Sequence, residues 1–149
     1  SILGLRTDVT PEHELGAALE SYIEWFSELS GVPTTLDARE MNHAQFPLSV
    51  QAQLVRVVQE ALSNVRRHAR ARNARVVLAR AGEFAQITIE DDGVGFDPNQ
   101  LPKQPLPHVG LSSMRERVES VGGKFWVDSA SGQGTRVQIQ MPIVQRGSD

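Results

Sequence analysis

The stretch that decides the fold runs from residue 48 to residue 90 and reads LSVQAQLVRVVQEALSNVRRHARARNARVVLARAGEFAQITIE. Between residues 48 and 71, apolar residues recur at intervals of three and four, which predicts an amphipathic helix. Residues 74–80 and 84–90 predict the two strands of a hairpin, because apolar and polar side chains alternate along the second of them. A one-sided helix followed by such a hairpin predicts helices packed on a sheet.

The segments on either side extend this pattern. Residues 12–30 and 111–121 carry the same helical spacing, and glycines follow each of them. Three further runs have the length and composition of strands: residues 34–38, 125–128 and 135–141. We therefore expect an α/β domain, a two-layer sandwich in which three helices cover one face of a mixed, mostly antiparallel sheet.

The composition limits the possible functions. The 149 residues are 40% hydrophobic and 22% charged, as expected of one folded domain, and the net charge of −3 does not favour nucleic acid or a membrane surface as the general partner. The six arginines between Arg66 and Arg80 are the best argument for nucleic acid, but they lie partly on a helix end in an acidic protein. The chain has no cysteine, which excludes disulfides and thiol chemistry. No apolar run of about 18 residues is present, so we expect no membrane contact from this part of the protein, and the lack of cysteine is compatible with the cytoplasmic location that we expect for it.

Three polar residues of the predicted helix over residues 48–71 form a row beside its apolar stripe. Glu60, Asn64 and His68 are spaced four apart, so their side chains lie on one flank of the helix. Carboxylate and amide oxygens suit Mg²⁺ that is shared with phosphates and water, and a carboxylate there could orient or deprotonate an attacking group. The alternative reading is a solvated helix face.

Three glycine-containing motifs follow the first predicted hairpin, follow the long loop after it, and form the turn of the second predicted hairpin. Asp91–Phe96 reads DDGVGF, in which the glycines allow close approach of a ligand and a carboxylate can accept a hydrogen bond from an exocyclic amine. Residues 97–109 contain four prolines, and Gly110 then opens a helix whose first amides suit phosphate. Ser131–Thr135 reads SGQGT. Each motif alone has a bland alternative, which is a turn or the start of a helix.

The order of the four motifs is specific. Glu60–Ala69, Asp91–Phe96, Gly110–Val118 and Gly132–Thr135 resemble the N, G1, G2 and G3 boxes of the gyrase, Hsp90, histidine kinase and MutL ATPase superfamily, which has the Bergerat-type fold. The string GLSSMRERV over residues 110–118 is similar to that of histidine kinases that pair with NarL-type response regulators.

This resemblance implies a Mg-ATP-binding protein histidine kinase domain in which Glu60 is the acid that polarises the attacking group and Asn64 is a Mg²⁺ ligand. It implies that Asp91 accepts a hydrogen bond from the adenine amino group, with Thr135 beside it through a water, and that residues 97–109 form the ATP lid. The implied nucleotide-binding residues are Asn64, Arg67, His68, Asp91, Gly93, Gly95, Gly110, Leu111 and Thr135.

In this family, Arg67 and His68 would approach the phosphates, and Gly110 and Leu111 would begin the helix of the second glycine box. The sequence departs from the family pattern at Pro107–Val109, where another glycine is usual, and at Ser113, which is often glycine. The geometry of the lid is therefore less defined by the resemblance than the adenine site.

The phosphoacceptor histidine of such kinases lies on a separate helical domain. We expect residues 1–31 to be the end of that dimerisation region with a connecting helix, residues 32–144 to be the ATPase domain, and residues 145–149 to be a polar tail. His13 precedes Glu14 as an acceptor would, but no second hairpin helix accompanies it, so we expect His13 to be a surface or linker residue. The expected partners are ATP, the phosphoacceptor domain of the same kinase and a NarL-type response regulator.

Two other functions fit parts of the sequence. An anti-sigma-factor-type serine kinase shares the N and G1 boxes, but the helix with Met114, Arg115, Glu116 and Arg117 favours the histidine kinases. A non-catalytic module that changes its lid conformation with nucleotide would use the same binding residues, and only an assay of phosphate transfer separates it from a kinase.

Overall fold

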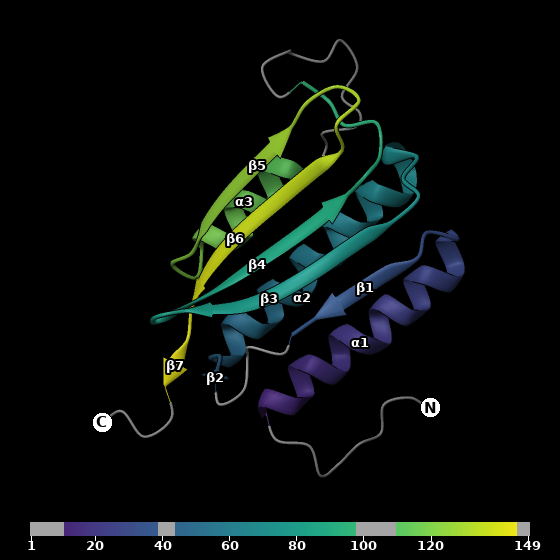
Figure 1. Cartoon of the computed structure of the whole chain (residues 1–149). Helices are drawn as coiled ribbons and strands as arrows, with labels where there is room; N and C mark the ends of the chain where they lie inside the picture. The colour runs from purple at the N-terminus through teal and green to yellow at the C-terminus, as the bar shows by residue number, and fades with distance from the viewer. Residues whose placement is uncertain (1–10, 39–43, 98–109, 146–149) are drawn as a thin grey trace.

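The computed structural model describes residues 11–38, 44–97 and 110–145. Figure 1 shows two layers, a twisted sheet and the helices that pack against it. The helical elements and then the strands are α1 (Pro11–Ser30), α2 (Leu48–Asn64), η2 (Val65–Ala69) and α3 (Leu111–Glu119), followed by β1 (Thr34–Asp37), β2 (Ala44–Gln45), β3 (Ala74–Ala81), β4 (Phe84–Asp91), β5 (Lys124–Ser129), β6 (Thr135–Pro142) and β7 (Val144–Gln145).

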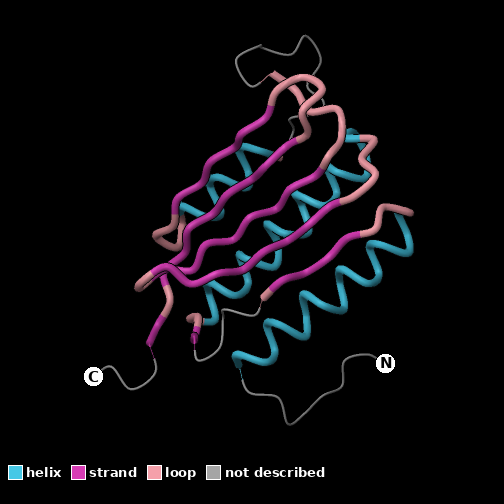
Figure 2. The backbone as a smooth tube through the Cα atoms, in the orientation of Figure 1, coloured by secondary structure: helices cyan, strands magenta, loops and turns pink. Residues whose placement is uncertain are grey.

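The main sheet has five strands in the order β1-β3-β4-β6-β5. β1 pairs with β3 in parallel, and the other neighbours are antiparallel, while β2 and β7 form a separate two-stranded pair. Figure 2 shows that the helices cover one face of the sheet and leave the other face open. The predicted two-layer α/β sandwich with a mixed, mostly antiparallel sheet is therefore confirmed.

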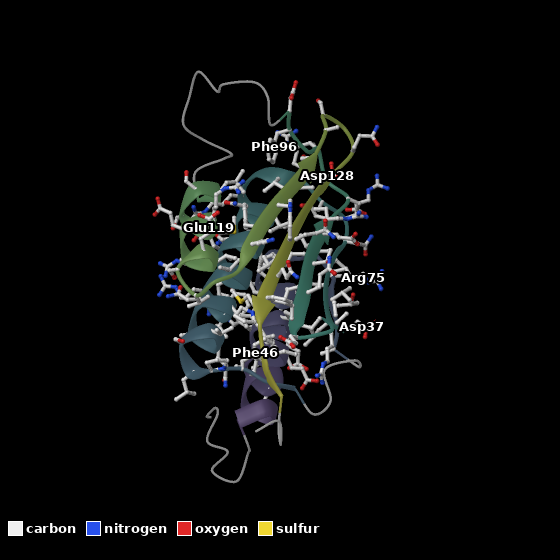
Figure 3. All side chains as sticks on the ribbon, turned by 90° about the vertical axis from the view of Figure 1, so that its left-hand side faces the viewer. Asp37, Phe46, Arg75, Phe96, Glu119 and Asp128 are labelled. Atoms are coloured by element: carbon white, nitrogen blue, oxygen red, sulfur yellow. The ribbon has the colours of Figure 1, made fainter. Side chains whose placement is uncertain are left out.

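One hydrophobic core lies between the two layers. The predicted stripe on α2 is buried, with Leu54, Val57, Val58 and Leu62 at 0% exposure, and α1 contributes four buried residues to the same core: Leu15, Leu19, Ile23 and Phe26. β4 contributes the side chains that were predicted to alternate: Ala85, Ile87 and Ile89. The other face of the sheet is polar, and Figure 3 shows Asp37 and Arg75 on that side and Glu119 on the helix side.

The long helix predicted over residues 48–71 is interrupted near its end. The α-helix stops at Asn64, and a π-helical turn, η2, continues the chain through Val65–Ala69. Arg70 then adopts a left-handed conformation with φ of 52° and ends the helix. A π-helical turn widens the helix and changes the direction of its side chains, and such turns are frequent at functional sites.

The register of the sheet brings the ends of four strands together at one end of the sheet. Ala74 at the start of β3 pairs with Asp91 at the end of β4, and Asp91 pairs with Thr135 at the start of β6. Thr135 in turn pairs with Ser129 at the end of β5. The end of α2 lies at this same end of the sheet, because the chain passes directly from η2 into β3 (Figure 1). Residues from motifs far apart in the sequence therefore meet here.

Candidate functional site

A cavity of about 100 Å³ lies between the end of α2 and the end of the sheet where Asp91 and Thr135 pair. Five of the residues predicted from the sequence line it, namely Asn64, Asp91, Gly95, Leu111 and Thr135, together with Ala61, Val65, Ile89, Val94, Phe96 and Val137. Most of the lining is apolar, and the polar groups come from three separate elements. A small apolar cavity with a few converging polar groups suits a flat ring with a polar edge.

Asp91 is the carboxylate of this cavity. It is the last residue of β4, and its Oδ1 accepts a hydrogen bond from the Gly93 backbone amide over 2.8 Å. Burial raises the pKa of Asp91 above its usual range, while the backbone amides of Gly93 and Thr135 oppose that shift. Asp91 thus brings to the cavity a carboxyl group that already accepts a hydrogen bond from Gly93 and can accept another from a ligand.

Ser129 is a residue of the site that the sequence did not single out. Its Oγ accepts a hydrogen bond from the Phe96 backbone amide over 3.0 Å and donates to the Gly134 carbonyl over 2.8 Å. The Oγ1 of Thr135 lies 3.0 Å from the same hydroxyl. Figure 3 shows Phe96 close to the end of the strand that carries Asp128. The pairing of Ser129 with Thr135 across the second hairpin was the sequence signal that could have identified it.

The glycines of the first and third boxes bring backbone against backbone. Gly95 has φ of 64°, and a Cβ placed there would contact the Ala130 carbonyl and lie 2.7 Å from the Gly134 carbonyl oxygen. Gly134 has φ of 76°, and its Cβ would contact the Asp91 carbonyl. L-residues rarely adopt these dihedral angles, and the space for a side chain is filled by main chain. These two glycines therefore permit close packing of the loops that form the cavity wall.

Glu60 lies beside the start of α3 and outside the cavity lining. A Cβ on Gly110 would lie 2.7 Å from the Glu60 Oε2 and 3.3 Å from its Cγ, so the carboxylate occupies the side of Gly110 that a side chain would need. Gly110 is the N-cap residue before α3, with φ of 100°, and as a glycine it makes no side-chain cap bond to the helix amides. The structure thus brings the predicted acid of α2 next to the predicted phosphate-binding end of α3.

The other predicted residues have varied positions. Gly93 is buried and donates to Asp91, whereas Arg67 is exposed on η2 and does not line the cavity. The side chain of His68 and the predicted lid beyond Asp97, up to Val109, lie outside the described residues. The side chains of His13 and of Glu14 also lie outside them.

Asp92 has a structural role that differs from that of Asp91. Its Oδ1 accepts hydrogen bonds from the backbone amides of Arg72 and Asn73 over 2.8 and 2.9 Å, and its Oδ2 accepts from the Asn73 side chain over 3.3 Å. The Asn73 and Arg72 amides hold the pKa of Asp92 below its usual range. Asp92 therefore fixes the connection between η2 and β3, while its neighbour faces the cavity.

Within the described ranges, no helix is long and apolar enough to cross a membrane.

Comparison with known proteins gives consistent matches. Residues 49–145 match the family model described as histidine kinase-, DNA gyrase B-, and HSP90-like ATPase. The sensor histidine kinase YhcY of Bacillus subtilis (strain 168) is 42% identical over 93 residues, which are 62% of this chain and 24% of that protein. The sensor histidine kinase YxjM of the same organism is 30% identical over 127 residues, which are 85% of this chain and 30% of that protein. The chain thus spans about a quarter to a third of these relatives.

Solved structures of low sequence identity share the fold. The histidine kinase domain of the blue-light activated histidine kinase from Erythrobacter litoralis EL346 matches with a TM-score of 0.71 at 23% identity, over 93% of this chain and 65% of that chain. The histidine kinase AdeS of Acinetobacter baumannii matches with a TM-score of 0.66 at 13% identity, over 94% of this chain and 68% of that chain.

Proposed function

Because this chain belongs to the histidine kinase-, DNA gyrase B- and HSP90-like ATPase family, as the ATP-binding catalytic domain of a two-component sensor histidine kinase, we propose that its cavity holds the adenine of Mg-ATP. The bound nucleotide then supplies its γ-phosphate to a histidine on a separate domain. The observation that carries this proposal is the cavity itself, which is lined by at least one residue from each of the three glycine boxes and by the end of α2.

Asp91 provides the adenine contact. Its oxygens only accept hydrogen bonds when the carboxyl is ionised, so they pair with the 6-amino group of adenine. The apolar side chains of Ala61, Ile89 and Val137 line the same cavity and suit the faces of the purine ring. Thr135 is beside Asp91 across the β4–β6 pairing and would reach the base through a water.

The phosphates would extend from the cavity toward the start of α3. Within residues 110–145, the N-cap Gly110 offers no side chain to the first amides of this helix, and these amides and the helix dipole suit an anion. Asn64 lines the cavity at the end of α2, and its amide oxygen suits Mg²⁺ that is also bound by phosphate oxygens and water. Bound Mg²⁺ would neutralise phosphate charge. Arg67 on η2 would add positive charge near the phosphates, and His68 would approach them.

Glu60 is the proposed catalytic residue. Its carboxylate is half-buried and lies next to Gly110, at the start of α3, where the phosphates are proposed to bind. In the transfer, a bond forms between an imidazole nitrogen of the acceptor histidine and the γ-phosphorus, while the bond to the oxygen that remains on ADP breaks. Glu60 would accept the proton from that imidazole or orient its ring.

The partners outside this chain follow from the same assignment. We propose that the acceptor is the phosphoacceptor histidine domain of the same kinase and that a NarL-type response regulator receives the phosphate afterwards, in the cytoplasm. Residues 110–118, which suggested this branch, comprise Gly110 and most of α3, and of them Leu111 lines the cavity. The boundary at residue 31 between a connecting helix and the ATPase domain stays a prediction, although α1 packs into the same hydrophobic core as α2 and the sheet.

The decisive experiment combines nucleotide binding with phosphate transfer. The domain is titrated with ATP by calorimetry, with and without Mg²⁺, and is then incubated with γ-labelled ATP and a separately expressed phosphoacceptor domain. We expect acid-labile phosphate on the acceptor and none on the ATPase domain alone. Acid-stable phosphate would instead identify a serine kinase, and binding without transfer would identify a non-catalytic module.

The role of Glu60 is tested in the same assay. Glu60→Gln should lower the transfer rate by about 10²- to 10⁴-fold while ATP still binds, because general base catalysis contributes on that order. Glu119→Gln is the matched control, since Glu119 is an exposed glutamate at the end of α3. An equal rate for the Glu60 variant and the control would contradict the catalytic assignment.

A further inference from the structure

Ser129 connects three parts of the site without lining the adenine cavity. Its hydroxyl contacts the Phe96 amide, the Gly134 carbonyl and the Thr135 hydroxyl at 3.0, 2.8 and 3.0 Å. Phe96 belongs to the first glycine box and Gly134 to the third, and both Phe96 and Thr135 line the cavity. A half-buried hydroxyl with three partners has its hydrogen-bonding capacity fully used.

A count of hydrogens assigns the direction of each bond. A serine hydroxyl has one hydrogen to donate and two lone pairs that accept. The Gly134 carbonyl can only accept, so it receives the single hydrogen of Ser129. The Phe96 amide can only donate, so it uses one lone pair. The remaining lone pair must accept from Thr135, and the arrangement that satisfies all three contacts therefore has Thr135 donating to Ser129.

This direction fixes what Thr135 offers to a ligand. Its only hydrogen is bound by Ser129, so the lone pairs of Oγ1 are what the hydroxyl presents to the cavity. Asp91, which pairs with Thr135 across the β4–β6 ladder, also presents acceptors. Both polar side chains that face the base from the sheet thus demand hydrogens from the ligand or from a bridging water.

We propose that Ser129 is a positioning residue for base selectivity, which keeps the Thr135 hydroxyl an acceptor and so strengthens the preference for adenine over guanine. This inference rests on the proposed function. Adenine satisfies the site, because its 6-amino group donates to Asp91 and a water can donate both to Thr135 and to the ring nitrogen at position 1. Guanine brings a 6-oxo group, which needs a donor where this pair of side chains has none to give.

A purely structural role for Ser129 gives a different result. If Ser129 only joins the Phe96 amide to the Gly134 carbonyl, its loss loosens the cavity wall and weakens the binding of ATP and of GTP by the same factor. If it also directs Thr135, its loss frees the Thr135 hydrogen to reach a 6-oxo group, directly or through water. The ratio of the ATP and GTP dissociation constants separates the two roles, because a uniform loss cancels in that ratio.

The test measures ATP and GTP affinity of the whole domain by calorimetry at fixed Mg²⁺. Ser129→Ala should reduce the preference for ATP over GTP by about threefold to tenfold, as expected for one hydrogen bond gained by the wrong base. Ser129→Thr keeps the hydroxyl and should restore the preference. Ser30→Ala is the matched control, because the Ser30 hydroxyl also donates to a carbonyl, that of Phe26, and accepts from an amide, that of Val32, and Ser30 does not line the cavity.

A second background tests the route through Thr135. In a Thr135→Val domain, Ser129→Ala should leave the ATP to GTP ratio unchanged, since the hydroxyl that Ser129 directs is gone. If Ser129→Ala does not fold by circular dichroism, Ser129→Cys, whose thiol is a weak hydrogen-bonding group, should lower the preference in the same direction. An unchanged ratio in the folded Ser129 variants would overturn the inference while leaving ATP binding intact. Failure of the unmodified domain to bind ATP would instead refute the proposed function, and this inference with it.

Discussion

The close approach of the third glycine box to Asp91 predicts a large difference between two glycine-to-alanine substitutions. Gly134 and Gly132 have nearly the same backbone conformation, with φ of 76° and 78°. A Cβ at Gly132 would have no neighbour within 4 Å. A Cβ at Gly134 would contact the Asp91 carbonyl oxygen and lie 3.2 Å from both the Asp91 carbonyl carbon and the Asp92 Cα.

The two contributions to the cost can therefore be separated. Gly132→Ala carries only the left-handed conformation, which costs an alanine about 1–2 kcal/mol. Gly134→Ala carries that cost and a steric overlap with main chain that cannot rotate away, and overpacking typically adds about 1–3 kcal/mol. We expect destabilisation of about 2–5 kcal/mol for Gly134→Ala against about 1–2 kcal/mol for Gly132→Ala.

Urea titration followed by circular dichroism measures both free energies of unfolding, and ATP titration of the same proteins measures the consequence for the site. Gly134→Ala should also weaken ATP binding more than Gly132→Ala, because relief of the overlap displaces the end of β4 that carries Asp91. Equal free energies of unfolding for the two variants would refute the reasoning, since it would mean that main chain does not fill the space beside Gly134.

Three further substitutions test separate features of the site. Asn64→Ala should remove the Mg²⁺-dependent part of ATP affinity and leave thermal stability nearly unchanged, because this half-buried amide flanks the core stripe; an unchanged Mg²⁺ dependence in calorimetry would contradict the assignment. Asp91→Asn should reduce the preference for ATP over GTP, since an amide can donate to the 6-oxo group of guanine; equal preference in the variant and the unmodified domain would show that Asp91 does not read the base. Asp92→Asn should lower stability at neutral pH. The pKa of Asp92 is lowered in the fold, so the stabilisation by its carboxylate is present above the ordinary carboxyl pKa of 3.8 and is lost as the pH falls through the lowered value. The unfolding free energies of the variant and the unmodified domain should therefore converge at low pH. A difference between them that does not change with pH would argue against the bonds to Asn73 and Arg72.

Most of the fold could be predicted because its signals are local. The stripe from Leu54 to Val65 and the alternation from Ala85 to Ile89 depend on neighbours in the chain, and the structure buries both. The errors occur where local signals are short. Strands β2 and β7 have two residues each, which is too few for a period to show, and the π-helical turn at Val65–Ala69 has the composition of an ordinary helix.

The sequence by itself determined the order of the four motifs, and therefore the family, the α/β class and five of the residues that line the cavity. The tertiary structure decided which of those residues share a wall. Glu60 lies beside Gly110, which is 50 positions later in the chain, and the Ser129 hydroxyl accepts a hydrogen bond from the Phe96 amide, 33 positions earlier. Such contacts depend on strand register and on the angle at which α2 crosses the sheet, because a shift of one residue would turn Ser129 to the opposite face. Periodicity specifies which face of an element is buried, but the meeting of two elements is set by packing of the whole core.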